Sequence, residues 1–127
     1  MFRITKEFHF SASHQLTSLP PDHQCARLHG HNYIVEITVS GQVDDKTGMV
    51  CNLTDLDGFI EREVLARYDH ENLNTLKDFA RDVPTTENLC IQIYEILHRG
   101  FPHAHLERVR LEETMMNSFE YAGEGKN

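Results

Sequence analysis

The sequence predicts a single α+β domain in which two helices cover one face of an antiparallel sheet. Segments near both ends of the chain alternate between apolar and polar residues, which is typical of half-buried strands. Between them lie two segments whose apolar residues have helical spacing. The resulting order β-β-α-α-β-β favours a sheet with helices on one face. The length of 127 residues fits one domain that spans residues 1–127.

The two N-terminal strands are predicted from alternation. In the first, the even positions are apolar: Phe2, Ile4, Phe8, Phe10 and Ala12. His14 continues that face if no bulge intervenes, because side chains alternate along a strand. After a loop over residues 15–28, the second strand is expected over residues 29–41. Its apolar positions are odd: Tyr33, Val35, Ile37 and Val39.

The helices and the C-terminal strands follow. The first helix is expected from Leu53 to about Tyr68, with an apolar stripe formed by Leu53, Leu56, Phe59, Ile60 and Val64. A polar loop covers residues 69–83, and a threonine N-cap opens the second helix, which Gly100 ends. Strands are expected over residues 106–115 and 117–122, with Val109, Leu111 and Glu113 on one face.

Composition excludes several classes of protein. A net charge of −8 argues against a general nucleic-acid binder, and a phosphate site would need a local positive cluster. No apolar run is long enough to span a membrane, and the N-terminus follows a strand pattern instead of that of a signal peptide. Three scattered cysteines favour a reducing, cytoplasmic compartment over a disulfide framework. Cys51 and Cys90 are expected to be small core residues.

Histidines form the first candidate site. His29 and His31 lie two residues apart on the second strand, so both point to its apolar face. His14 ends the apolar face of the neighbouring strand. Three neutral imidazoles with an open fourth position are the ligand set of catalytic zinc. The alternative is that the pair arises by chance among nine histidines and that His14 is a hydrogen-bonded core residue.

Two further groups carry chemistry. Cys25 lies four residues before the histidine pair, and Asp69-His70 can serve as an oriented base toward a thiol. The alternative for Asp69-His70 is a solvated loop. Glu113 falls on the core-facing side of its strand, where a carboxylate is costly without a partner. Such a carboxylate suits an aminopyrimidine edge that donates two N–H groups, although a strand end explains it equally well.

Taken together, these residues resemble the family of 6-pyruvoyltetrahydropterin and 6-carboxytetrahydropterin synthases. The resemblance rests on ordered blocks along nearly the whole chain: Phe10-Ser11-Ala12-Ser13-His14, Cys25-x-x-x-His29-Gly30-His31-Asn32-Tyr33, Thr47-Gly48-Met49-Val50, Tyr68-Asp69-His70-Glu71-Asn72-Leu73-Asn74, Pro84-Thr85-Thr86-Glu87-Asn88-Leu89 and Glu113-Thr114. It implies the tunnelling fold, in which a trimer closes its sheets into a β-barrel and two trimers stack into a homo-hexamer.

The resemblance also implies roles for individual residues. It implies Zn²⁺ on His14, His29 and His31. It implies a catalytic triad assembled across a subunit interface from Cys25, Asp69 and His70. It implies that Glu113 anchors the pterin ring, helped by Thr85 and Thr86.

The reaction that the resemblance implies acts on 7,8-dihydroneopterin triphosphate. Three residues separate Cys25 from His29, as in the bacterial 6-carboxytetrahydropterin synthases, whereas the animal pyruvoyl enzymes usually have five. The implied products are 6-carboxy-5,6,7,8-tetrahydropterin, acetaldehyde and triphosphate, on the way to 7-deazapurines such as queuosine. The main alternative is 6-pyruvoyltetrahydropterin formation, which the residues 49–53 and 85–88 resemble as closely. A non-catalytic metal or pterin binder would need neither Cys25 nor Asp69-His70, and a zinc hydrolase would lack its usual His-Glu-x-x-His helix.

Overall fold

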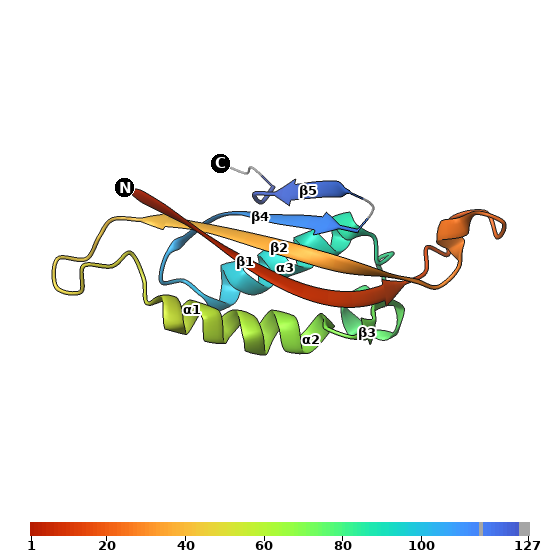
Figure 1. Ribbon diagram of the computed structural model, residues 1–127, viewed down its shortest axis with the longest axis horizontal. Coiled ribbons are helices and arrows are strands. Elements are labelled where there is room, and N and C mark those ends of the chain that lie inside the picture. Colours follow the sequence, from red (N-terminus) through yellow and green to blue (C-terminus); the bar gives the residue numbers. More distant parts are fainter. Residues whose placement is uncertain (115, 125–127) are drawn as a thin grey trace.

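Two long strands, β1 (Phe2–His14) and β2 (His29–Gly41), form the centre of the fold (Figure 1). The computed structural model describes residues 1–114 and 116–124 of the chain. β1 and β2 are antiparallel, and their register runs unbroken from Phe2 opposite Gly41 to His14 opposite His29. No bulge therefore changes the face of His14, which is only 3% exposed, as the alternation predicts.

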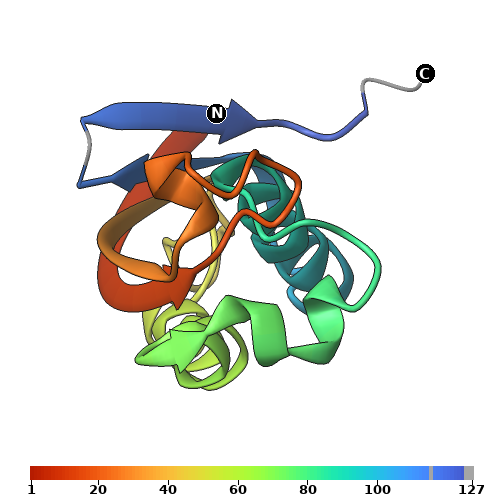
Figure 2. The ribbon, with the colours of Figure 1, turned by 90° about the vertical axis from the view of Figure 1, so that its right-hand side faces the viewer.

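The hairpin of β4 (His105–Glu113) and β5 (Asn117–Tyr121) extends the sheet beyond β2. The strand predicted over residues 106–115 thus begins at His105 and ends at Glu113, and residue 115 lies outside the described residues. Across residues 1–114 and 116–124, five strands form one sheet in the order β3-β1-β2-β4-β5. Figure 2 shows this sheet curving around two helices that lie side by side on one of its faces. The predicted α+β class is confirmed.

Both predicted helices are present. α1 (Leu53–Ile60), a π-helical segment η2 (Glu61–Leu65) and α2 (Ala66–Tyr68) follow one another without a break. The second helix is α3 (Thr86–Gly100). Each helix begins at a side-chain cap, because the Asn52 side chain accepts a hydrogen bond from the Thr54 N–H and Thr85 Oγ1 accepts one from the Asn88 N–H.

The segment over residues 69–83 was expected to be a loop, and this expectation is wrong in part. It contains β3 (Glu71–Asn72), which pairs in parallel with β1, and two short 3₁₀ helices, η3 (Leu73–Thr75) and η4 (Lys77–Phe79). Elements of two or three residues are too short for any hydrophobic period to reveal them. A third 3₁₀ turn, η1 (Gln24–Ala26), lies in the β1–β2 loop.

The core fills the space between the helices and the sheet. Most of its fully buried side chains come from β2, from β4 and from both helices, among them Tyr33, Val35, Ile37, Leu56, Ile60, Val64, Leu89, Ile93, Val109 and Leu111. Two residues that were expected on buried faces, Phe2 and Leu53, are instead 60% and 38% exposed. Each is the first residue of its element, so one side of it faces solvent. Among the helices of the described part, none has the length and apolar character required to cross a membrane.

Candidate metal centre and adjoining cavities

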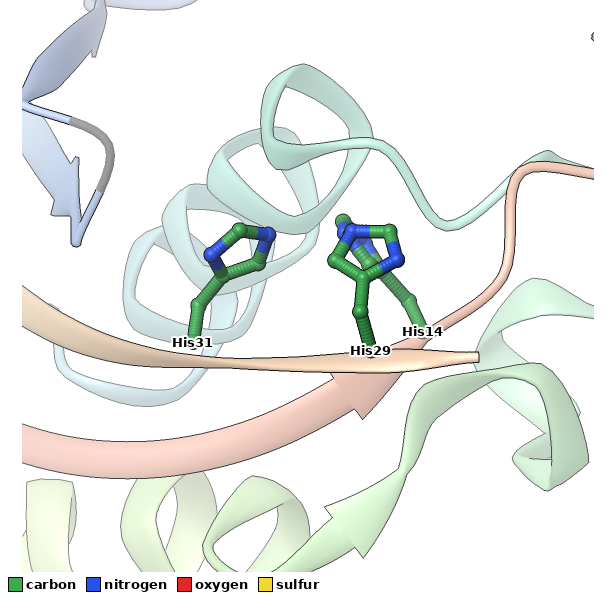
Figure 3. Close-up of side chains that lie close together, drawn as sticks. All are labelled: His14, His29 and His31. Carbon is green, nitrogen blue, oxygen red and sulfur yellow. The ribbon is translucent and has the colours of Figure 1, made fainter. Parts of the chain in front are cut away.

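His14, His29 and His31 meet at one end of the sheet. Because His14 lies opposite His29 in the ladder, and His31 follows His29 by two residues, all three rings leave the sheet on the same face. Figure 3 shows the three side chains on the side of β1 and β2 that faces α3. The ring centroids lie 4.6–5.0 Å apart, and the ligand atoms of the three rings lie within 4.8 Å of one another.

The Nδ1 atom of each ring lies within hydrogen-bond distance of a partner on another residue. His14 Nδ1 lies 2.7 Å from the Pro84 carbonyl oxygen, His29 Nδ1 lies 2.7 Å from the Arg27 carbonyl oxygen, and His31 Nδ1 lies 3.1 Å from Thr114 Oγ1. Carbonyl oxygens only accept hydrogen bonds, so the Nδ1 atoms of His14 and His29 carry the protons. Their Nε2 atoms are then bare and face each other at 3.0 Å. Metal-binding histidines are oriented in this way in many proteins.

Burial keeps the rings of His14 and His31 in the form that binds metals. It lowers the pKa of His14 and the pKa of His31, and the nearby histidines lower both pKa values further. The hydrogen bond to Pro84 opposes the lowering of the His14 pKa, and the carboxylate of Glu113 opposes it at both rings, but neither reverses it. A lowered pKa favours the neutral imidazole at neutral pH, and the neutral ring is the metal ligand.

The three histidines fit a zinc ion. Zinc bound at about 2.0–2.1 Å from each nitrogen in a tetrahedral site requires nitrogens about 3.3 Å apart. The observed 3.0 Å between two Nε2 atoms and the 4.8 Å limit for the set bracket that value. Three nitrogen ligands leave the fourth position for a substrate oxygen or water, which is the arrangement of a catalytic site and not of a closed structural one.

A cavity of about 250 Å³ lies beside the histidines, and it gathers most of the predicted site residues. It is lined by the three histidines together with Leu16, Cys25, Thr85, Thr86, Glu87, Glu113 and Phe119. The predicted thiol, the predicted pterin-anchoring residues and the predicted metal ligands therefore share one space. Thr85 and Thr86 reach this space because they open α3.

Glu113 is a buried hydrogen-bond acceptor that lines this cavity. The residue is 9% exposed, and its Oε2 accepts a hydrogen bond from Thr86 Oγ1 at 2.5 Å. Its Oε1 accepts one from the Asn117 side-chain amide at 3.3 Å. A carboxylate has about four lone-pair positions, so two acceptor positions remain for N–H donors of a bound molecule. The placement of Glu113 on the face of Val109 and Leu111 agrees with the predicted alternation.

Asp69 and His70 lie together at the outer edge of β1. Asp69 Oδ1 accepts a hydrogen bond from the Ser11 N–H at 3.0 Å and lies 3.1 Å from His70 Nδ1. The His70 N–H donates to the Ser11 carbonyl oxygen. His70 also has a φ of 63°, in the left-handed region that is rare for residues other than glycine and is concentrated at functional sites. Its side chain is 82% exposed, so the Asp69 carboxylate and the His70 backbone hold the pair against β1 while the imidazole stays accessible.

Asp69 and His70 line a different cavity from Cys25. That cavity, of about 470 Å³, is also lined by Ser11, Asn32 and Glu113. Ser11 and Asn32 have the opposite parity to His14 and His31, so they belong to the face of the sheet away from the helices. Within one chain, the structure thus brings Asp69 to His70 but places Cys25 in the other cavity.

Sequence reasoning assigned no role to three residues that lie at the site. Tyr33 is fully buried with its ring 5.7 Å from that of His31, Thr114 contacts His31, and Phe119 forms an apolar wall of the smaller cavity. The position of Phe119 follows from the register of β4 and β5, because Phe119 lies opposite Leu111 and therefore shares the face of Glu113. Thr114 has no such signal, since it follows the last residue of β4.

The comparisons with known proteins agree on one family. Residues 3–124 match the family described as 6-pyruvoyl tetrahydropterin synthase. The 6-pyruvoyl tetrahydrobiopterin synthase of Homo sapiens is 38% identical over 96% of this chain and 92% of its own length. The 6-carboxy-5,6,7,8-tetrahydropterin synthase of Bacillus subtilis is 37% identical over 93% of this chain and 77% of its own length. The structure of Caenorhabditis elegans 6-pyruvoyl tetrahydropterin synthase superposes with a TM-score of 0.85, at 31% identity, over 96% of this chain and 95% of that one.

Proposed function

Because this chain belongs to the 6-pyruvoyl tetrahydropterin synthase family, we propose that it converts 7,8-dihydroneopterin triphosphate to 6-carboxy-5,6,7,8-tetrahydropterin. Acetaldehyde and triphosphate are the other products. The observation that carries the choice of product is the three-residue spacing between Cys25 and His29, which resembles the bacterial 6-carboxytetrahydropterin synthases. That spacing fixes where the thiol of the β1–β2 loop enters the cavity beside the histidines.

The cavity geometry supports a pterin as the substrate. The aminopyrimidine edge of a pterin offers adjacent N–H donors, and Glu113, which lines the cavity, has free acceptor positions. Thr86 and Asn117 hold the two carboxylate oxygens in place, so the orientation of the ring is set before it binds. Leu16 and Phe119 supply apolar wall.

His14, His29 and His31 would hold zinc within reach of the side chain of the bound pterin. Zinc bound there would act as a Lewis acid on the side-chain hydroxyls and ease the loss of protons at and beside those carbons. The three histidines contribute rings whose Nδ1 atoms are already engaged by Pro84, Arg27 and Thr114.

Proton transfer is assigned to Cys25 with the Asp69–His70 pair. Cys25 lines the same cavity as Glu113 and the histidines, so its thiol can exchange protons with the pterin side chain. In our proposal Asp69 orients the imidazole of His70, which serves the Cys25 of a neighbouring subunit. The separation of Cys25 and His70 into different cavities of one chain supports this arrangement.

Formation of 6-pyruvoyltetrahydropterin is the second candidate. The human relative is a 6-pyruvoyl tetrahydrobiopterin synthase with 38% identity, against 37% for the 6-carboxy enzyme of Bacillus subtilis, so identity does not separate the two products. The same metal ligands and the same anchor would serve either reaction.

Mass analysis of the products from 7,8-dihydroneopterin triphosphate tests the proposal. Acetaldehyde together with 6-carboxytetrahydropterin is the expected result. 6-Pyruvoyltetrahydropterin without acetaldehyde would establish the second candidate instead. Binding of the substrate without turnover by the zinc-loaded protein would contradict both and indicate a non-catalytic pterin binder.

A further inference from the structure

The end of β4 holds the His31 ring from two sides. On one side, Thr114 Oγ1 lies 3.1 Å from His31 Nδ1. On the other, Glu113 Oε2 lies 4.0 Å from His31 Nε2. Thr114 therefore contacts the Nδ1 of this imidazole within hydrogen-bond distance, whereas the Glu113 carboxylate lies beyond that distance from its Nε2. A neutral imidazole carries one proton, so a hydrogen bond donated by the Nδ1–H leaves Nε2 free to bind a metal.

We propose that Thr114 is the positioning residue of the metal ligand His31, an inference that rests on the metal site of the proposed function. Its hydroxyl oxygen accepts the Nδ1–H of His31 and so leaves Nε2 bare and directed toward His14 and His29. If the proton moved to Nε2, it would face Glu113 and the ring could no longer bind a metal through that atom. Thr114 therefore holds the ring in the orientation that directs Nε2 toward the metal position.

His31 differs from the other two histidines in this dependence. His14 and His29 are oriented by the backbone carbonyl oxygens of Pro84 and Arg27, which no side-chain substitution removes. His31 also lies near a carboxylate, because Glu113 Oε2 is 4.0 Å from its Nε2. A single side chain thus decides whether the third ligand is available.

The geometry also connects the metal to the pterin anchor. Thr114 lies in the turn between β4 and β5, and this turn is closed by the Met116 N–H, which donates to the Glu113 carbonyl oxygen at 2.9 Å. Thr114 therefore links His31 to the turn that directly follows Glu113.

Replacement of the hydroxyl with a methyl group of similar size tests the proposal. Thr114→Val should weaken the affinity for Zn²⁺ and Co²⁺, measured by competition with a chromophoric chelator, by about 10–100-fold. Thr114→Ser keeps the acceptor and should remain within about threefold of the unchanged protein, well below that range. Thr54→Val is the matched control, because Thr54 is exposed at the start of α1 and far from the histidines in the fold.

Long-range ¹H–¹⁵N spectra of the metal-free protein above pH 7.5 give a readout independent of the variants. The unchanged protein should show His31 protonated on Nδ1, and Thr114→Val should shift the proton toward Nε2. A His31 protonated on Nε2 in the unchanged protein would overturn the inference. So would a folded Thr114→Val that binds metal as tightly as the control. If His31→Ala binds zinc as tightly as the unchanged protein, the metal site itself is misassigned, and the proposed function fails first.

Discussion

Cys25 combines accessibility with a position beside the three histidines. It lies in the 3₁₀ turn η1, where its N–H donates to His23 Nδ1 at 3.1 Å, and its thiol is partly exposed. The turn does not hold the fold together, because the proposed metal ligands lie on β1 and β2. The residue can therefore be changed without loss of the fold, which makes its chemical role testable.

Cys25→Ala should retain zinc and folding but lose most of the turnover. General acid–base groups typically contribute about 10²–10⁴-fold, so steady-state rates should fall by an amount in that range. Cys51→Ala is the control, since Cys51 is buried and lies outside the cavity. A fall of less than about threefold, far below the usual contribution, would show that Cys25 is structural.

The three thiols should also differ in reactivity. Burial raises the pKa of Cys51, and burial with the Glu120 charge raises the pKa of Cys90 to about 12. Both thiols therefore stay protonated and enclosed at pH 8, whereas Cys25 is accessible. Titration with a disulfide reagent should show one fast thiol in the native protein and two that react only after unfolding. Loss of the fast phase in Cys25→Ala identifies it, and a fast phase that persists would contradict the assignment.

Among individual site residues, the sequence predicts those whose position follows from the alternation of side chains along a strand. His14, His31 and Glu113 share faces with Phe10, Tyr33 and Leu111 because β1, β2 and β4 keep their register near the site, and the bulge of β2 against β4 lies at Thr38 and Val39. Thr114 lies beyond the last residue of a strand, where alternation no longer applies, so its contact with His31 could not be inferred.

The two helix caps allow an effect on stability to be distinguished from an effect on substrate binding. Asn52 and Thr85 cap α1 and α3 in the same way, but only Thr85 lines the cavity. Asn52→Ala and Thr85→Ala should each lower the free energy of unfolding by about 1 kcal/mol, measured by urea denaturation. Only Thr85→Ala should also raise KM for the pterin substrate. An equal effect of both variants on KM would mean that Thr85 acts only through helix stability.

Long periodic elements are predictable from this sequence, and very short ones are not. The bounds of β2 and the extent of the first helix agree with the pattern, because each has enough residues for a period to show. β3 has two residues and no apolar alternation, yet it fixes the segment that follows Asp69 and His70 to β1. The position of the Asp69–His70 pair therefore depends on tertiary contacts with Ser11 that no local pattern encodes.

The outer edge of β1 favours assembly of the chain into an oligomer. In the described part of the sheet, β3 pairs only with Ala12 and Ser13, so β1 from Phe2 to Phe10 presents backbone groups without a neighbouring strand. Exposed edges of this length are usually covered in native proteins. We therefore expect the active unit to be an oligomer in which sheets of neighbouring subunits join, and the family resemblance predicts a hexamer. Light scattering that shows a monomer at working concentration would contradict this.

Subunit complementation tests whether the triad is shared. Cys25→Ala chains and His70→Ala chains should each be inactive, but mixed oligomers should regain partial activity. Some interfaces will then pair an intact Cys25 with an intact His70. Native mass spectrometry verifies that subunits have exchanged. If exchange is complete and activity stays at the level of the separate variants, the triad is not assembled between subunits.

The π-helical segment η2 corrects the angular phase of the first helix. The fully buried residues Leu56, Ile60, Val64 and Tyr68 are spaced by four. In a regular helix of 3.6 residues per turn, each step of four overshoots a full turn by about 40°, so three steps would rotate Tyr68 about 120° away from Leu56. The wider winding of a π-helical segment turns less per residue and offsets this drift.

Tyr68 consequently still faces the sheet, with its ring 6.3 Å from that of Phe10. The chain leaves the helix directly after Tyr68, so this phase also sets the direction in which Asp69 and His70 emerge beside Ser11. The wider winding of η2 thus sets the direction of the exposed His70 imidazole. A fully regular helix of the same sequence would direct this side chain away from the edge of β1.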